Sequence, residues 1–176
     1  MTMILDAKQI QQIPKEFLPA VVFSDNLWSW ISFRIKLHKL DFYSHAMLLE
    51  SAMGLVSQDK ILQRRPLLDF LKGKHRVKIW RNKSWSPKQR EKAMGFIKEQ
   101  LQRKDLRYDQ LSILGRLLRL KFLQWKNRRD CCEHVSEFLF SMDPLFTFLR
   151  PTPGQINRWL QTQKDWEVWA VYDPGI

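Results

Sequence analysis

Residues 42–58, FYSHAMLLESAMGLVSQ, decide the fold of this chain. The apolar run over residues 42–49 predicts a buried strand, and the small and polar residues over 51–54 predict a turn. Residues 55–58 then predict a second strand that pairs back on the first. Because a turn this short joins only antiparallel strands, the stretch predicts a hairpin within an antiparallel sheet.

Outward from this hairpin, strand patterns are mixed with amphipathic helical ones. Strands are predicted at residues 18–23, 76–80 and 166–172, helices at 27–40, 87–103, 108–126, 130–141 and 153–161, and one or two helical turns at 66–71. Most strands lie too close in sequence for helical crossovers between them. The predicted fold class is therefore α+β, an antiparallel sheet packed against several helices.

Three helix starts carry capping signals. Ser-Pro-x-Gln at 86–89 and Thr-Pro-x-Gln at 152–155 each place a hydroxyl at the N-cap, proline at the first helical position and glutamine three residues after the cap. Residues 24–26, Ser-Asp-Asn, are all N-cap types and precede the helix predicted from residue 27. These signals predict where the helices begin.

Length and composition indicate one domain of 176 residues, with a polar lead-in over 1–16 and a C-terminal helix and strand extension over 143–176. A hydrophobic content of 44% excludes a chain that is disordered throughout. Residues 1–13 do not resemble a signal peptide, and no run approaches ~20 uninterrupted apolar residues. We therefore expect no transmembrane segment and a cytoplasmic location.

The two cysteines are adjacent, which excludes a disulfide scaffold and a four-cysteine zinc module. They lie in Asp130-Cys131-Cys132-Glu133, where Asp130 and Glu133 have the residue types of a capping box. Cys131 would be the first helical residue, and the positive end of the helix dipole favours a thiolate there. The alternative is that both cysteines are small buried residues under a helix. No metal or other cofactor is predicted, because two adjacent cysteines with a histidine two residues on fit no standard zinc spacing.

His45 is the candidate base, because a histidine on a strand can project toward the start of a helix that packs on the sheet. A third polar group should orient its ring, and Ser57 and Gln58 on the partner strand are the candidates. Their side chains point to opposite faces of that strand, so only one of them can serve. We expect Gln58 in preference to Ser57.

Four segments in a fixed order carry a family resemblance. They are PAVVFSDNLWSWISFRIKLHKLDFYSHAMLL (19–49), KIWR (78–81), SPKQREKAMGFIKEQLQRKDLRYDQLSILG (86–115) and CCEHVSEFL (131–139). The set resembles the circularly permuted papain-like cysteine hydrolases, the YiiX-like branch of the NlpC superfamily. The resemblance implies a permuted papain-like fold in which the catalytic histidine precedes the catalytic cysteine, the order of His45 and Cys131 here.

Carried onto this chain, the resemblance makes Cys131 the nucleophile and His45 the base. Cys132 stands at the family's serine position, and the remaining matches are Glu133, Val135, Tyr43, Tyr108 and Asp109. Two departures are visible. Ala20 and Val21 stand where the family often has Gly-Asp, and no acidic residue follows the histidine strand within residues 55–58.

The implied function is acyl transfer. A Cys131 thiolate attacks a carbonyl carbon, His45 protonates the leaving group, and water then hydrolyses the acyl-enzyme. The backbone N–H of Cys131 is a candidate oxyanion donor. The resemblance implies amide or peptide bonds, often in cell-wall peptides, with esters and thioesters as further options; the expected partner is a peptide- or acyl-containing substrate.

Two alternatives remain open on the same fold. The chain carries 30 Lys and Arg against 18 Asp and Glu, a formal charge of +12, which attracts polyanions. Seven of these cations lie between Arg107 and Arg129, with Phe122 and Trp125 nearby, a pattern that could contact a phosphate backbone and stack a base. The first alternative is therefore a protein that binds nucleic acid or another polyanion. The second is a catalytically weak structural component.

Overall fold

The structure is a computed structural model that describes residues 3–4, 13–26, 43–51, 54–58, 62–71, 75–103, 107–108, 128–129, 131–148 and 151–174. Every element and contact below belongs to these ranges. The helices predicted at 27–40 and 108–126 lie outside them, apart from Tyr108, which is in a short strand.

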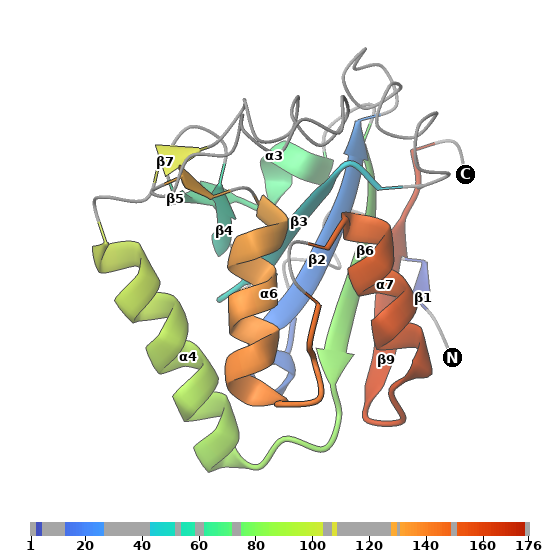
Figure 1. The fold of residues 1–176 in the computed structure, drawn as a ribbon. Helices are drawn as coiled ribbons and strands as arrows, with labels where there is room; N and C mark the ends of the chain where they lie inside the picture. The colour runs from blue at the N-terminus through green and yellow to red at the C-terminus, as the bar shows by residue number, and fades with distance from the viewer. Residues whose placement is uncertain are drawn as a thin grey trace.

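A seven-stranded sheet forms the centre of the described chain, in the order β1-β9-β6-β2-β3-β4-β5 (Figure 1). The strands are β1 (Met3–Ile4), β2 (Ala20–Asn26), β3 (His45–Leu49), β4 (Gly54–Gln58), β5 (Leu62–Pro66), β6 (His75–Asn82) and β9 (Trp166–Tyr172). Neighbours pair antiparallel, except that β1 lies parallel to β9. The predicted hairpin of β3 and β4 is confirmed, and the fold class is α+β.

Three longer helices and several short elements complete the described part. The helices are α4 (Pro87–Gln102), α6 (Cys131–Met142), α7 (Pro153–Thr162) and the single turn α3 (Leu68–Leu71), with a 3₁₀ turn η1 (Lys15–Phe17) and a separate pair of two-residue strands, β7 (Arg107–Tyr108) and β8 (Arg128–Arg129). Figure 1 shows α6 between α4 and α7, in front of the sheet. No described helix is long and apolar enough to cross a membrane.

The sheet is buried on both faces, and strand alternation divides the core in two. On one face, Phe23, Leu48 and Val56 pack with Val135, Phe138 and Leu139 of α6 and with Ile97 of α4. On the other face, Val22, Met47 and Leu55 pack with Phe70 and Leu71 of α3. Cys131, the candidate nucleophile, belongs to the core on the face that carries α6.

Both predicted proline-led helix starts are confirmed. In α4 and α7 the N-cap hydroxyl accepts a hydrogen bond from the glutamine N–H three residues on, and the glutamine side chain accepts one from the cap N–H. Each capping box satisfies backbone N–H groups that have no partner within the helix. Local chemistry was therefore sufficient to predict these two boundaries.

The structure also differs from the sequence analysis within the sheet. Residues 24–26 are part of β2 and pair with β6 along their whole length, and the helix predicted to follow them lies outside the described residues. The polar strand β5 was not predicted; it is an edge strand with alternating burial, which needs no apolar run. The strand of the predicted C-terminal extension, β9, lies inside the sheet between β1 and β6. Residues 3–4 of the predicted lead-in also join the sheet.

Candidate active site

Cys131 is the first residue of α6, as predicted, and only 5% of it is exposed. The helix packs against β3 and β4. Its start lies beside the start of β3, because the Cys131 sulfur hydrogen-bonds His45 and Ala46. The backbone N–H groups of a first helical turn have no acceptor within the helix, and the positive end of the dipole lies among them. The Cys131 sulfur is therefore held in an electropositive position. The predicted N-cap, Asp130, lies outside the described residues.

His45 is the first residue of β3 and is half-buried. Its ring reaches two groups. The Nε2 atom lies 3.1 Å from the hydroxyl oxygen of Ser57, and the imidazole hydrogen-bonds the sulfur of Cys131. Ser57 is fully buried on β4. Cysteine, histidine and a polar third group are thus linked by hydrogen bonds.

Cys131 contacts the start of β3, beyond the residues at which β3 pairs with β4. The two strands pair at Leu48 with Val56 and at Leu49 with Leu55, so His45 and Ala46 lie beyond these paired positions. The backbone N–H of Ala46 donates a hydrogen bond to the Cys131 sulfur. The end of the hairpin therefore contributes a backbone donor to the site as well as the imidazole.

Hydrogen bonds hold the pKa of Cys131 well below its usual value, with the thiol of Cys132 as the largest cause. The nearby charge and hydrogen bond of His45 and the Ala46 N–H act in the same direction. Burial opposes them, because a low-dielectric environment disfavours the charged form. The combined effect favours a thiolate, the reactive form of cysteine.

The sequence predicted which cysteine and histidine meet but favoured a different third group. The hydrogen bond observed at Nε2 of His45 is with Ser57, the residue that we ranked second. The side chain of Gln58 lies outside the described residues, and so do those of Tyr108 and Arg128 and the whole of Asp109. A serine hydroxyl can accept a hydrogen bond from a ring N–H or donate one to an unprotonated ring nitrogen, so it suits either tautomer.

Two polar residues near His45, buried Asp25 and half-buried His75, were not predicted to lie close to the site. Asp25 follows Ser24, the β2 partner of His45. Burial is the main cause that raises the pKa of Tyr43, and the Asp25 charge acts in the same direction. His75 on β6 has its pKa lowered, chiefly by burial, while the Asp25 carboxylate acts in the opposite direction. In the sequence, Asp25 comes just after the apolar run of residues 18–23. An acidic residue at that place is also typical of a helix N-cap, which is how the sequence analysis interpreted it.

His134 contacts a neighbouring helix. It is buried on α6 and its ring stacks on Phe96 of α4, with the centroids 6.4 Å apart and 28° between the planes. Across the ranges that the structure covers, no group of three His, Cys, Asp or Glu residues is arranged to hold a metal ion. The remaining family matches on α6 are Glu133, which is half-buried, and Val135, which is fully buried in the core.

Tyr43, the aromatic residue of the family pattern, is part of the core beside the site. Its ring centroid lies 5.6 Å from that of Phe23, and the Lys78 ammonium lies 5.2 Å from the same ring centroid. Burial is the main cause that raises the pKa of Tyr43 to about 12. The phenol therefore stays neutral in the folded chain at pH values where an exposed tyrosine is ionised.

Alkaline pH should destabilise the protein through Tyr43. The folded pKa lies above the unfolded value near 10, so this contribution is complete below pH 10 and is lost as the pH rises through 12. Between pH 9 and pH 11.5, we expect a loss of about 2 kcal/mol in the free energy of unfolding from this group. Urea unfolding of the wild type and of Tyr43→Phe measures it. Equal losses in the two proteins would contradict the assignment to Tyr43.

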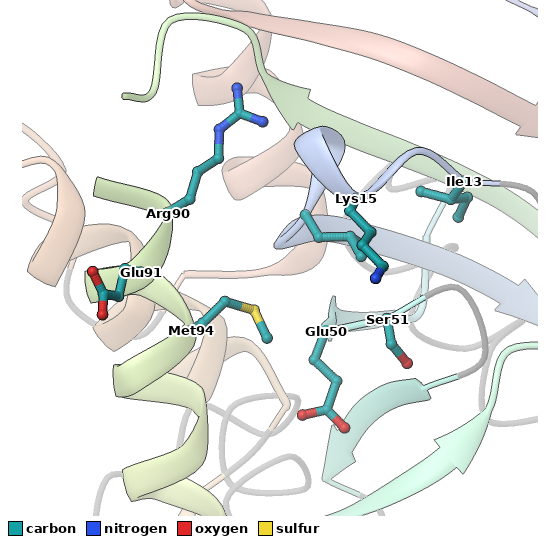
Figure 2. Close-up of a pocket in the computed structure, with 8 residues that line it drawn as sticks. Ile13, Lys15, Glu50, Ser51, Arg90, Glu91 and Met94 are labelled. Atoms are coloured by element: carbon teal, nitrogen blue, oxygen red, sulfur yellow. The ribbon is translucent and has the colours of Figure 1, made fainter. Parts of the chain in front are cut away.

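A pocket of about 530 Å³ lies at the other end of β3 (Figure 2). Met94 of α4, Lys15 of η1 and Glu50, the residue after β3, extend into it. Glu50 also forms an ion pair with Arg64 of β5. Since β3 separates Glu50 from His45 by five residues, about 16 Å of strand, this pocket is distinct from the cysteine site.

The predicted polyanion-binding stretch is described only at its two ends, where β7 and β8 pair with Arg107 opposite Arg128. The rest of that prediction lies outside the described residues.

The sequence was also compared with known proteins. No protein-family model matches it, and no curated protein sequence matches it significantly.

Proposed function

We propose that the protein is a cysteine hydrolase with a permuted papain-like arrangement, which cleaves an amide or peptide bond, or an ester or thioester, through an acyl-enzyme. One observation carries the proposal. The sulfur of Cys131, at the first residue of α6, hydrogen-bonds the imidazole of His45, whose Nε2 lies 3.1 Å from Ser57. A nucleophile, a base and a group that orients the base are what covalent acyl transfer requires.

In the proposed reaction, the Cys131 thiolate attacks the substrate carbonyl carbon. The backbone N–H of Cys131, at the positive end of the α6 dipole, would stabilise the developing oxyanion. The His45 imidazolium then gives its proton to the leaving amine or alcohol, and the acyl-enzyme forms. In the second half, His45 takes a proton from water, which attacks the acyl group and releases Cys131.

Ser57 would serve as the orienting group in this mechanism. With Nε2 engaged by Ser57, Nδ1 is the ring nitrogen suited to exchange protons with the Cys131 sulfur. A neutral hydroxyl fixes the plane of the ring but stabilises an imidazolium less than a carboxylate does. The proposal therefore expects moderate rather than high turnover, with Cys131 and His45 essential and Ser57 contributing less.

Acetylation by p-nitrophenyl acetate tests the proposal without knowledge of the natural substrate. We expect a burst of p-nitrophenol of about one equivalent per chain, because acylation of an activated ester outruns hydrolysis of the acyl-enzyme. Peptide mass spectrometry after an acid quench should place the acetyl group on Cys131. In Cys131→Ala the burst should disappear.

The Cys131→Ala variant keeps its lysines, so the acetylation measured in it gives the background of this assay. Equal acetylation of Cys131 and Cys132, or adducts on lysine alone, would contradict the proposed nucleophile. The same samples, followed for the release of acetate, show whether the acyl-enzyme turns over.

A further inference from the structure

The proposed hydrolase mechanism leaves the second thiol of the site without a chemical role. Cys132 follows Cys131 in the first turn of α6, both thiols are free of disulfides, and their sulfur atoms lie 3.9 Å apart. The Cys132 thiol hydrogen-bonds the Cys131 sulfur. One reactive sulfur therefore has a second sulfur as its immediate neighbour.

We propose that this pair is a site of reversible oxidation by hydrogen peroxide, in which Cys131 is oxidised to a sulfenic acid and Cys132 converts it to a vicinal disulfide. The inference shares the Cys131 thiolate with the proposed function, and it does not depend on acyl transfer. It assigns Cys132 as the resolving thiol, a role that the family resemblance does not include because it places serine at that position.

The chemistry balances with peroxide as the only oxidant. The Cys131 thiolate attacks one peroxide oxygen, the O–O bond breaks, and the departing hydroxide takes a proton from the His45 imidazolium to leave as water. The sulfur loses two electrons and becomes a sulfenic acid. The Cys132 sulfur then attacks it, the S–S bond forms, the S–O bond breaks, and the hydroxide leaves as water with the Cys132 proton.

The position of the pair favours this internal second step. Cys131 is 5% exposed and Cys132 4% exposed, so a thiol from another protein molecule has little access to the sulfenic acid. The 3.9 Å between the two sulfurs makes Cys132 the nearest reductant. Prompt disulfide formation would keep Cys131 from reaching the sulfinic acid, which thiols do not reduce.

Strain should make the disulfide easy to reduce. The sulfurs must close from 3.9 Å to about 2.05 Å, while consecutive Cα atoms stay about 3.8 Å apart, below the usual disulfide range. Strained disulfides have oxidising potentials and are labile. The expected outcome is a switch that inactivates the nucleophile and is reversed by a small dithiol.

Peroxide titration of the full chain tests the proposal. With a few equivalents of hydrogen peroxide, we expect non-reducing peptide mapping to show an internal Cys131–Cys132 disulfide. Dithiothreitol should return at least nine-tenths of the chains to the dithiol. In Cys132→Ser, dimedone should instead trap a sulfenic acid on Cys131, and continued peroxide should accumulate the sulfinic acid at least tenfold faster than in the wild type. In Cys131→Ser, Cys132 should remain unoxidised at the same dose.

Two outcomes would overturn the inference: sulfinic acid forming on Cys131 as fast in the wild type as in Cys132→Ser, or disulfides forming between chains only. The p-nitrophenyl acetate burst, measured on the same preparations, separates the two proposals. A burst without an internal disulfide removes the role of Cys132 and leaves the hydrolase standing. An internal disulfide without a burst does the reverse.

Discussion

Replacing His45 with alanine is expected to lower the turnover of p-nitrophenyl acetate at pH 7 by about 10²- to 10⁴-fold, the usual contribution of general acid–base catalysis. The physical reason is that both halves of the proposed reaction pass a proton through this imidazole. The same change removes a charge and a hydrogen bond that favour the Cys131 thiolate. The midpoint of Cys131 alkylation by iodoacetamide should therefore shift upward, toward the ordinary thiol value of about 8.5.

The shift should be incomplete, because the Cys132 thiol and the Ala46 N–H still donate to the sulfur. Ser57→Ala should be milder, with a loss of roughly tenfold in turnover, since it deletes one neutral hydrogen bond to the ring. Ser136→Ala is the matched control, because that buried hydroxyl donates its hydrogen bond to the backbone carbonyl of Cys132. An alkylation profile that is the same in His45→Ala and the wild type would rule out the thiolate–imidazolium pair.

Replacing Phe138 with alanine is expected to cost about 3–5 kcal/mol of unfolding free energy, the largest stability effect that we predict. Phe138 is fully buried on α6 between Trp85, with ring centroids 6.0 Å apart, and Phe96 of α4, at 5.9 Å. Its removal leaves a cavity where α4, α6 and the segment before α4 meet. The midpoint of thermal unfolding should fall by roughly 6–20 °C, measured by circular dichroism.

Phe140→Ala on the same helix is the control for this loss. Phe140 is 60% exposed, so the same truncation there creates no cavity and should change stability by less than about 0.5 kcal/mol. Similar losses in the two variants would show that α6 does not pack through Phe138. Urea unfolding at equilibrium gives both values on one scale.

Local chemistry explains what was predictable about the fold. Proline and a capping hydroxyl specify the starts of α4 and α7 within four residues, and an apolar run, a turn and a second run specify the hairpin of β3 and β4. Cys131 as the first residue of α6 was predictable for the same reason. The polar strand β5 was not, because an edge strand is held by its neighbour's backbone and leaves little pattern in its own side chains.

Candidate nucleophile and base could also be named from the sequence, since their residue types and order suggest a cysteine–histidine pair. The contact between the two side chains depends on tertiary structure. His45 and Cys131 are 86 positions apart, and only the packing of α6 on β3 brings the thiol to the imidazole.

By itself, then, the sequence determined the α+β class, the hairpin and two of the helix starts, because each depends on interactions between residues close in the chain. Tertiary structure decided the rest. It placed β9 inside the sheet, extended β2 through Asp25, and gave His45 a hydrogen bond with Ser57. Neighbouring residues on a strand face opposite ways, and which of them meets a distant side chain depends on the register and packing of the whole sheet.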